Sequence, residues 1–416
     1  MSITEVSSEA EFDTLLSKHK LVIVDFYTDW CGPCKAMAPI YKELSEKEEY
    51  QDILFLKVNT EENQALGMRY QIRSIPTVMT FLEKDVLGQF AGFNERRLLS
   101  ELNLLLEVEN LDLVDFRGAK LVQEEVTLLE DLEKGWGQEF GTPDMEEDKA
   151  WGFEVEGLHV TTLYLNKVTE KVVLKPLSKF TRLLHLSLAN LALEEVPQEI
   201  LGLATLEILD LSGNRLKELP DLSALQSLKI LVLNENLLEA LPASLAELTL
   251  RGLDLRSNSF NSFPSNLPVG LELLSVADNP IGTIPSSINQ LTNLGMLDLT
   301  QIGLNTLPDE VRALENLERL FLGSNNLEIF PPVLTNLPEL KMVVMANNKV
   351  TEIGAEVGEM SELRALDISQ NPLKTLPQAL LNTQIVEVRT EEVELDQTGQ
   401  EILAEIEKRR YASFMG

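Results

Sequence analysis

The sequence predicts an α/β protein in two parts: an N-terminal domain with a mixed sheet flanked by helices, and then a solenoid of short parallel strands. Two cysteines, the only ones in 416 residues, directly follow a strand-like apolar run. Strand-like and helix-like segments alternate up to residue 107, which is typical of βαβ units. Leucines then recur at a step of 21 to 23 residues between positions 158 and 383, which indicates a stacked repeat.

The composition describes a folded protein, with 44% hydrophobic and 25% charged residues. A net charge of −32 repels phosphate backbones and anionic lipid, so we expect neither nucleic acid nor a membrane surface as a partner. Residues 1–20 hold no signal-peptide pattern, and no later stretch reaches about 18 uninterrupted apolar residues. We therefore expect a cytoplasmic protein without a membrane span.

The elements of the first domain follow in order from the pattern. The nearly continuous apolar run Leu21–Tyr27 predicts a strand buried on both faces. Pro33 fits the first turn of a helix, which then runs to about Leu44. The remaining predicted elements are helices at 8–17, 62–70 and 95–106 and strands at 53–58, 77–82 and 86–90.

The two cysteines, Cys31 and Cys34, stand in the stretch Trp-Cys-Gly-Pro-Cys. Their spacing lets one thiolate attack a substrate disulfide and lets the second thiol resolve the mixed disulfide. A helix N-terminus at Cys31 would favour its thiolate. Structural zinc is the rival interpretation, but it needs four ligands, and the chain adds only three histidines, none at finger spacing. We expect no metal and no bound cofactor.

Asp25 lies inside the apolar run, where a carboxylate is costly unless it is paired. Lys57, on the next predicted strand, is a sensible partner. The alternative is that Asp25 ends the strand and faces solvent. Pro76 could be an ordinary turn proline, since only about 5–6% of such bonds are cis in folded proteins.

Five stretches together resemble thioredoxin and cover essentially all of residues 1–107. They are Val24-Asp-Phe26, Trp30-Cys-Gly-Pro-Cys-Lys35 with Pro39, Lys57-Val-Asn59, Ile72-Arg-Ser-Ile-Pro-Thr77 and Gly92. The resemblance implies the thioredoxin fold. It also implies that Cys31 is the attacking nucleophile, Cys34 the buried resolving thiol, and Asp25 the carboxylate that helps Cys34 lose its proton.

The resemblance further implies roles around the sulfurs. Lys57 would pair with Asp25, and Trp30 would shield the disulfide. Substrate backbone would dock at a cis Ile75–Pro76 bond, with Gly92 leaving room; Gly32 and Pro33 would also contact substrate. Gln71 and Lys84 replace glycines usual in the family, which predicts a different turn at Lys84. These departures bear on whether a thioredoxin reductase recycles this protein.

Residues 108–157 form an acidic segment that we interpret as a linker, over 107–118, and a helical N-terminal cap of the solenoid. Apolar spacing predicts the cap helix over 119–134. Trp136, Trp151 and Phe153 would cover the end of the core. The alternative is an acidic docking segment.

Residues 158–383 hold about ten copies of the repeat, which resembles the leucine-rich repeat family. The resemblance implies a horseshoe with parallel strands on its concave face, and the repeated leucines would be core. An asparagine in most copies would bond the backbone of adjacent turns: Asn214, Asn236, Asn258, Asn279, Asn325, Asn348 and Asn371. Leu191 and Ile302 interrupt this ladder, so the backbone polar groups of those turns must find other hydrogen-bond partners.

The strand positions between the leucines predict an apolar track on the concave face, flanked by aspartates. We expect this track to bind an unknown protein partner. The alternative is that neighbouring side chains stack on one another or that a tail covers them. The expected groove residues are Ile208, Ile230, Val232, Leu273, Met296, Phe321, Met342 and Val344.

Residues 384–416 predict the far cap of the solenoid, with a strand near 385–388 and a helix over 397–410. For the whole chain we expect a thiol–disulfide oxidoreductase that acts on proteins with disulfides and whose solenoid binds or selects them. The alternative is a non-catalytic scaffold that binds proteins through both parts.

Overall fold

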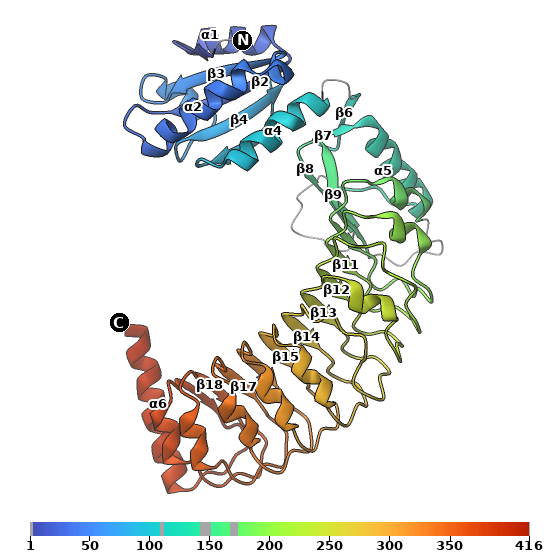
Figure 1. Ribbon diagram of the computed structural model, residues 1–416, viewed down its shortest axis with the longest axis vertical. Helices are drawn as coiled ribbons and strands as arrows, with labels where there is room; N and C mark the ends of the chain where they lie inside the picture. The colour runs from blue at the N-terminus through green and yellow to red at the C-terminus, as the bar shows by residue number, and fades with distance from the viewer. Residues whose placement is uncertain (1–2, 109–111, 142–150, 167–173, 416) are drawn as a thin grey trace. The chain divides into compact units, whose positions relative to one another are not determined.

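The computed structural model describes residues 3–108, 112–141, 151–166 and 174–415, and its chain divides into two compact units (Figure 1). The first unit contains Met1–Val126 and Val155–His159, and the second contains Thr127–Glu154 and Val160–Gly416. The predicted architecture agrees with the structure in both parts: a mixed sheet with helices on its two faces, then a long sheet of mainly parallel strands.

The first unit is built on a five-stranded sheet in the order β1-β3-β2-β4-β5. The central strand β2 runs parallel to β3 and antiparallel to β4. The strands are β1 Thr4–Glu5, β2 Leu21–Tyr27, β3 Ile53–Asn59, β4 Thr77–Leu82 and β5 Asp85–Ala91. The helices are α1 Glu9–Lys18, α2 Gly32–Glu46, the short 3-10 helix η1 Glu48–Tyr50, α3 Gln64–Arg69 and α4 Glu95–Val108.

Two apolar clusters hold the helices against the two faces of this sheet. Residues of α2 and α4 pack on the face of β2 that carries Leu21 and Ile23. Residues of α1 and α3 pack on the opposite face, which carries Val22 and Val24. Alternate residues of β2 thus enter different cores, which explains why the run reads as continuously apolar.

The hairpin turn of β4 and β5 differs from the prediction. Both turn residues, Glu83 and Lys84, have positive φ, at 49° and 81°. Gln71 also keeps a positive φ, at 51°. Residues with a Cβ thus adopt the left-handed conformation at these positions, so the absence of glycine does not prevent it.

A second hairpin occupies the segment where a linker and the start of a helix were expected. Strands β6 Leu113–Phe116 and β7 Ala119–Val122 pair in antiparallel register. The turn residues Arg117 and Gly118 both have positive φ, which matches a tight two-residue hairpin. The helix α5 therefore starts later than predicted, at Gln123, and ends at Trp136.

The first unit also includes residues 155–159, far along the chain from its sheet. Leu158 is only 1% exposed and lies in the same apolar cluster as Leu98, Leu102 and Leu105 of α4. The backbone N–H of Val122 donates to the carbonyl of Leu158 (3.2 Å). The core on the α4 side is thus completed by a residue from well beyond position 107.

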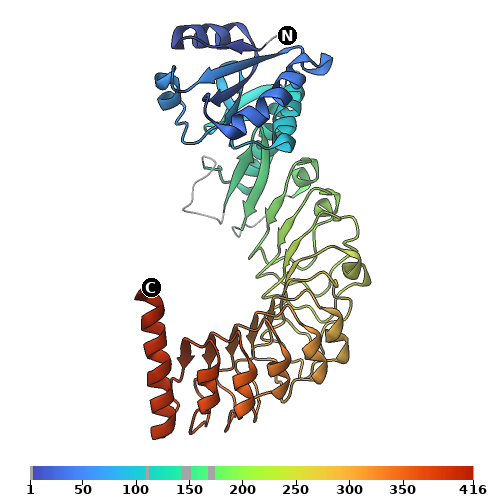
Figure 2. The same ribbon diagram turned by 60° about the vertical axis from the view of Figure 1, so that its left-hand side comes forward.

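The second unit is built on a twelve-stranded sheet whose strands follow in chain order from β8 to β19, and successive strands from β9 to β19 pair in parallel. The strands line the inner curve of this unit, and short 3-10 helices lie on its other side (Figures 1 and 2). The strands are β8 Trp151–Glu156, β9 His159–Leu165, β10 His185–Ser187, β11 Ile208–Asp210, β12 Ile230–Val232, β13 Gly252–Asp254, β14 Leu273–Ser275, β15 Met296–Asp298, β16 Arg319–Phe321, β17 Met342–Val344, β18 Ala365–Asp367 and β19 Glu387–Arg389. The 3-10 helices are η2 Lys175–Lys179, η3 Gln198–Gly202, η4 Ala243–Glu247, η5 Ser286–Gln290, η6 Asp309–Ala313, η7 Pro332–Asn336, η8 Ala355–Glu359 and η9 Gln378–Asn382.

The asparagine ladder is present, and its two interruptions are satisfied by the next asparagine along the chain. At most rungs the side-chain Oδ1 accepts one backbone N–H from the preceding repeat, as Asn348 does from Leu327 (3.0 Å). At the interruption at Ile302, Asn325 accepts two, from Ile302 (3.1 Å) and Leu304 (2.9 Å). Asn214 does the same at the interruption at Leu191, where it accepts from Leu191 and Leu193 (both 3.0 Å).

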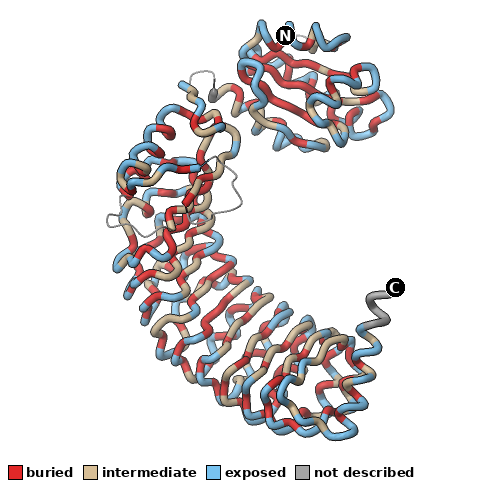
Figure 3. Tube along the Cα trace, turned by 180° about the vertical axis from the view of Figure 1, so that it is seen from behind, coloured by how far each residue is buried: buried red, intermediate tan, exposed pale blue. Residues whose placement is uncertain are grey.

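Both ends of the repeat unit contain buried residues (Figure 3). At the N-terminal end, the rings of Phe140 and Trp151 stack with their centroids 4.6 Å apart. The ring centroids of Trp136 and Trp151 are 4.9 Å apart. At the C-terminal end, α6 (Gln397–Met415) buries Ile402 and Ile406. Among the described residues, no helix combines the length and the apolar character that crossing a membrane requires.

Candidate functional site

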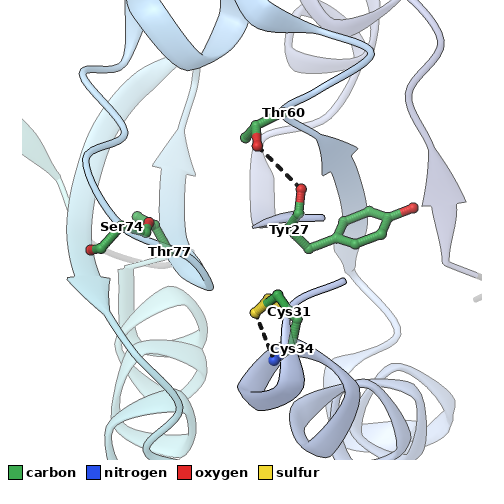
Figure 4. Close-up of a disulfide and its surroundings, with 6 residues drawn as sticks. All are labelled: Tyr27, Cys31, Cys34, Thr60, Ser74 and Thr77. Atoms are coloured by element: carbon green, nitrogen blue, oxygen red, sulfur yellow. Dashed lines mark hydrogen bonds between the residues drawn. A yellow bond between two sulfur atoms is a disulfide. The ribbon is translucent and has the colours of Figure 1, made fainter. Parts of the chain in front are cut away.

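The two cysteines form a disulfide at the N-terminus of α2 (Figure 4). Their sulfurs are 2.11 Å apart and their Cα atoms 5.3 Å apart. Cys31 is the N-cap residue of the helix, and the backbone N–H of Cys34 donates to the Sγ of Cys31 (3.1 Å). Pro33 lies in the first turn, where its missing N–H costs no helical hydrogen bond. The backbone N–H of Cys34 and the positive end of the helix dipole thus act on the first sulfur.

Both cysteines are buried, each with 4% of its surface exposed, whereas Gly32 and Pro33 between them are exposed. Cys31, the nucleophile that the resemblance implies, is thus covered in this disulfide form. Cys34 lies on the buried face of α2, and the S–S bond draws the side chain of Cys31 towards it.

The indole of Trp30 is 69% exposed. Its Nε1 donates to Glu61 Oε1 (2.8 Å), which holds the ring at the surface. The ring is therefore mostly open to solvent on its own account, and its expected role in shielding the disulfide stays a prediction. The hydrogen bond to Glu61 was not anticipated from the sequence.

The segment before β4 lies in the surroundings of the disulfide (Figure 4). The Ile75–Pro76 peptide bond is cis, Pro76 is buried and Ile75 is half-buried. The backbone N–H of Gly92 donates to the carbonyl of Pro76 (2.7 Å), which ties the end of β5 to this segment. Gly92 has a φ of +82°, which favours glycine, and nothing lies within 4 Å of the place a Cβ would take.

Asp25 is 1% exposed, and neither of its carboxylate oxygens has a hydrogen-bond partner. Burial raises the pKa of Asp25 to about 7, while the charge of Lys57 acts in the opposite direction. The two residues are register partners on β2 and β3, but they form no ion pair in the described structure. Instead, the Nζ of Lys57 lies 3.7 Å from the centroid of the Tyr27 ring. The two charges thus interact, but the direct Asp25–Lys57 ion pair that was expected is not formed in the described structure.

Tyr41 is a buried neighbour that sequence reasoning missed. Its hydroxyl donates to the carbonyls of Ile23 (2.9 Å) and Leu56 (3.0 Å). Burial, and then the charge of Asp25, raise the pKa of Tyr41 well above its usual value, so its hydroxyl stays neutral. Its position seven residues after Cys34, two helical turns along the same face, was the available signal.

The concave face of the repeat unit carries the predicted apolar track. The eight residues are paired across neighbouring strands or lie on adjacent ones, and all are half-buried or exposed. They are Ile208, Ile230, Val232, Leu273, Met296, Phe321, Met342 and Val344. The flanking aspartates have a structural part, since Asp298 accepts from the backbone N–H of Thr300 (3.0 Å) and from the hydroxyl of Ser275 (3.0 Å).

A hollow of about 470 Å³ interrupts the apolar track at β13. Gly252 stands there between Ile230 and Leu273 in the register, so the row lacks one side chain. Lys229 and Arg251 lie at one edge of the hollow. The sequence analysis did not predict this hollow.

Among the described residues, no group of three or more His, Cys, Asp or Glu side chains is placed to hold a metal ion.

Comparison with known proteins identifies the N-terminal part. The thioredoxin family model matches residues 3–103. A thioredoxin of Mycoplasmoides gallisepticum is 40% identical over 97 residues, which are 23% of this chain and 95% of that protein. The chain belongs to the thioredoxin family. Bovine thioredoxin is 33% identical over 106 residues, which are 25% of this chain and 99% of that protein. These relatives match the thioredoxin domain alone.

Comparison also identifies the second part. Models for leucine-rich repeats match residues 204–247 and 250–389. The solved structure of a leucine-rich repeat protein of Leptospira interrogans is 21% identical, with a TM-score of 0.43, and the match covers 57% of this chain and 86% of that one. The chain thus joins a thioredoxin domain that carries a Cys-x-x-Cys pair to leucine-rich repeats, which suggests redox chemistry together with protein interaction.

Proposed function

We propose that this protein is a thiol–disulfide oxidoreductase in which Cys31 attacks the disulfide of a protein substrate. The contact between the N–H of Cys34 and the sulfur of Cys31, at the N-terminus of α2, carries this proposal. In the reduced protein the same N–H and the helix dipole would favour the thiolate of Cys31.

The reaction balances within the two cysteines and the substrate. The Cys31 thiolate attacks one substrate sulfur, the substrate S–S bond breaks, and a mixed disulfide forms. The Cys34 thiolate then attacks the sulfur of Cys31 and displaces the second substrate thiolate. The substrate gains two electrons and takes up two protons, and Cys31 and Cys34 end as the observed disulfide.

Asp25 is the proposed acceptor of the Cys34 proton. A pKa of about 7 leaves the carboxylate partly ionised at neutral pH, so it can both take up and release a proton there. Lys57 would tune Asp25 by its charge. Returning the disulfide to the dithiol requires an external electron donor, for which we propose a thioredoxin reductase in a reducing compartment such as the cytoplasm.

The proposed substrate surface surrounds the disulfide. Gly32 and Pro33 are exposed beside the sulfurs, and Trp30 flanks them. The open space over Gly92, next to the cis Ile75–Pro76 segment, would admit the substrate backbone.

The repeats would bind or select the substrate through the apolar track. Tethering a binding surface to a reactive one raises the effective concentration, to the millimolar range for short flexible connections. Even weak binding at the track would therefore bias which disulfide reacts.

Reduction of insulin by dithiothreitol tests the oxidoreductase. The wild-type chain should accelerate insulin precipitation, and Cys31→Ser should abolish the acceleration. A Cys34→Ser variant should instead accumulate a mixed disulfide through Cys31. If the wild type and Cys31→Ser give the same turbidity curve, the oxidoreductase proposal fails.

A matched pair of substitutions tests the role of the repeats. Ile230 on the track is 39% exposed, and Ile329, which lies outside the strands of the concave sheet, is 59% exposed. In the Cys34→Ser background, Ile230→Asp should reduce the capture of mixed-disulfide partners, whereas Ile329→Asp should not. Neither change should alter insulin reduction in the chain with both cysteines. Equal capture by the two variants would show that the track does not select substrates.

One observation favours a second candidate, a non-catalytic scaffold. Both cysteines are 4% exposed in the disulfide form, so little sulfur surface is open to a partner. A scaffold would still bind proteins through the apolar track but would give no acceleration in the insulin assay.

A further inference from the structure

The ammonium of Lys57 lies against the face of Tyr27. Its Nζ is 3.7 Å from the ring centroid, well inside the roughly 6 Å within which cation–π attraction acts. The Tyr27 hydroxyl donates to Glu5 Oε1 (3.3 Å). Burial, together with the charges of Glu5, Asp29 and Glu62, raises the pKa of Tyr27 to about 12. The ring thus stays neutral, and the acids around it add to its attraction for an ammonium.

The same lysine has a second partner within its register. Asp25 is the Cα partner of Lys57 across β2 and β3, and Tyr27, two residues after Asp25, points to the same face of the sheet. The carboxylate of Asp25 is buried and accepts no hydrogen bond. A buried carboxylate ordinarily draws a neighbouring cation to itself. The Lys57 ammonium is therefore attracted both by the Asp25 carboxylate and by the Tyr27 ring. In the structure it lies against the ring.

We propose that Tyr27 is a positioning residue: its ring holds the Lys57 ammonium away from Asp25 and so keeps the carboxylate unpaired and able to accept a proton. The last step rests on the function proposed above, in which Asp25 takes the proton of Cys34. The placement of Lys57 itself does not depend on that function.

The groups that act on Asp25 from the surrounding elements are few. Lys57 faces it from β3, Tyr41 is coupled to it from α2, and its partner on β4 is the uncharged Val78. Tyr41 keeps its proton, so Lys57 is the one cation among these described groups. Moving Lys57 from the ring to the carboxylate would favour the ionised form of Asp25 and weaken it as a proton acceptor.

Two substitutions of similar size separate the ring face from the bulk of the side chain. Tyr27→Phe keeps the aromatic face and loses the hydroxyl, and Tyr27→Leu keeps apolar bulk without that face. Asp-selective ¹³C labelling of the full-length disulfide form reports the titration of Asp25 directly, with Asp25→Asn to assign its signal. We expect Tyr27→Leu to move the titration midpoint to lower pH by about 1 unit, and Tyr27→Phe to move it by less than about 0.3 unit.

A second background shows whether the effect passes through Lys57. With Lys57→Met, the midpoint should rise, and adding Tyr27→Leu should then cause no further fall. The proposal is overturned if Tyr27→Leu leaves the midpoint unchanged, or if it lowers the midpoint equally with Lys57→Met. The titration of Asp25 is measured without substrate. Its result therefore does not depend on whether the protein reduces insulin. The two proposals can therefore fail separately.

Discussion

A single buried carboxylate couples the stability of the thioredoxin domain to pH. The folded state holds the Asp25 proton up to about pH 7, whereas the ordinary pKa is 3.8. The folded state therefore binds more protons between these values, and the free energy of unfolding falls as pH rises. The stabilising contribution is complete below about pH 3.8 and is lost as pH passes through about 7.

Replacing Asp25 by asparagine should remove this pH dependence. We expect Asp25→Asn to raise the free energy of unfolding of the thioredoxin domain at pH 8, by roughly 4 kcal/mol at most, because no charge is then buried. Near pH 4 the gain should almost vanish, since the folded wild type is protonated there. Denaturant unfolding followed at both pH values checks this. A gain of the same size at pH 4 and pH 8 would contradict it.

At this scale the sequence located the residues but not their contacts. Cys31 and Cys34 lie at the predicted helix N-terminus, and Asp25 is buried within the predicted strand. The sequence could not decide whether Lys57 contacts Asp25 or Tyr27, because a four-carbon stem reaches both from one register position.

Among the structural elements, the repeats differ in how many hydrogen bonds the asparagine of each repeat makes. The side-chain amides of Asn325 and Asn348 each donate to three backbone carbonyls, and both side chains are buried. Asn325 accepts two backbone N–H groups, however, and Asn348 accepts one. Because Ile302 interrupts the ladder, Asn325 in the next repeat contributes more to the stability of the repeat unit.

The two asparagines form a matched pair for mutation. Asn325→Ala should destabilise the repeat unit more than Asn348→Ala, by about 1–3 kcal/mol, because it leaves one further buried N–H unpaired. Chemical denaturation followed by far-ultraviolet circular dichroism measures the difference. Equal losses for the two variants would mean that water or a shifted backbone satisfies the extra N–H.

Long periodic elements were predictable, and short ones were not. The strand Leu21–Tyr27 has the predicted bounds, and the repeat spacing placed the strands of the solenoid. The hairpin over 113–122 was missed because its strands have four residues each and their apolar positions also fit a helix. Arg117-Gly118 was the one turn signal in that segment.

For the molecule as a whole, the thioredoxin domain is not closed by its own first 107 residues. Leu158 belongs to its core cluster, and the β6–β7 hairpin lies in the same compact unit. The boundary at residue 107 was predicted from composition, which could not show that Leu158 belongs to the first unit. The sequence pattern assigns Leu158 to the start of the repeats.

Shortening Leu158 should therefore weaken the thioredoxin domain. We expect Leu158→Ala to cost about 2–5 kcal/mol, as for other fully buried leucines. Leu237→Ala is the control, since Leu237 is 44% exposed and should cost less than about 0.5 kcal/mol. Hydrogen exchange of β2 and β4, followed by mass spectrometry, isolates the effect. Unchanged protection of these strands in Leu158→Ala would contradict the assignment of Leu158 to this core.

The return of residues 155–159 to the first unit also limits how this protein can be recombined. A chimera that swapped in a foreign redox module at position 107 would discard the hairpin and leave Leu158 without its native neighbours. A transplantable cassette would have to extend at least to His159. Segments of the two units alternate along the chain, because residues 127–154 of the second unit precede residues 155–159 of the first. This alternation favours inheritance of the two parts together.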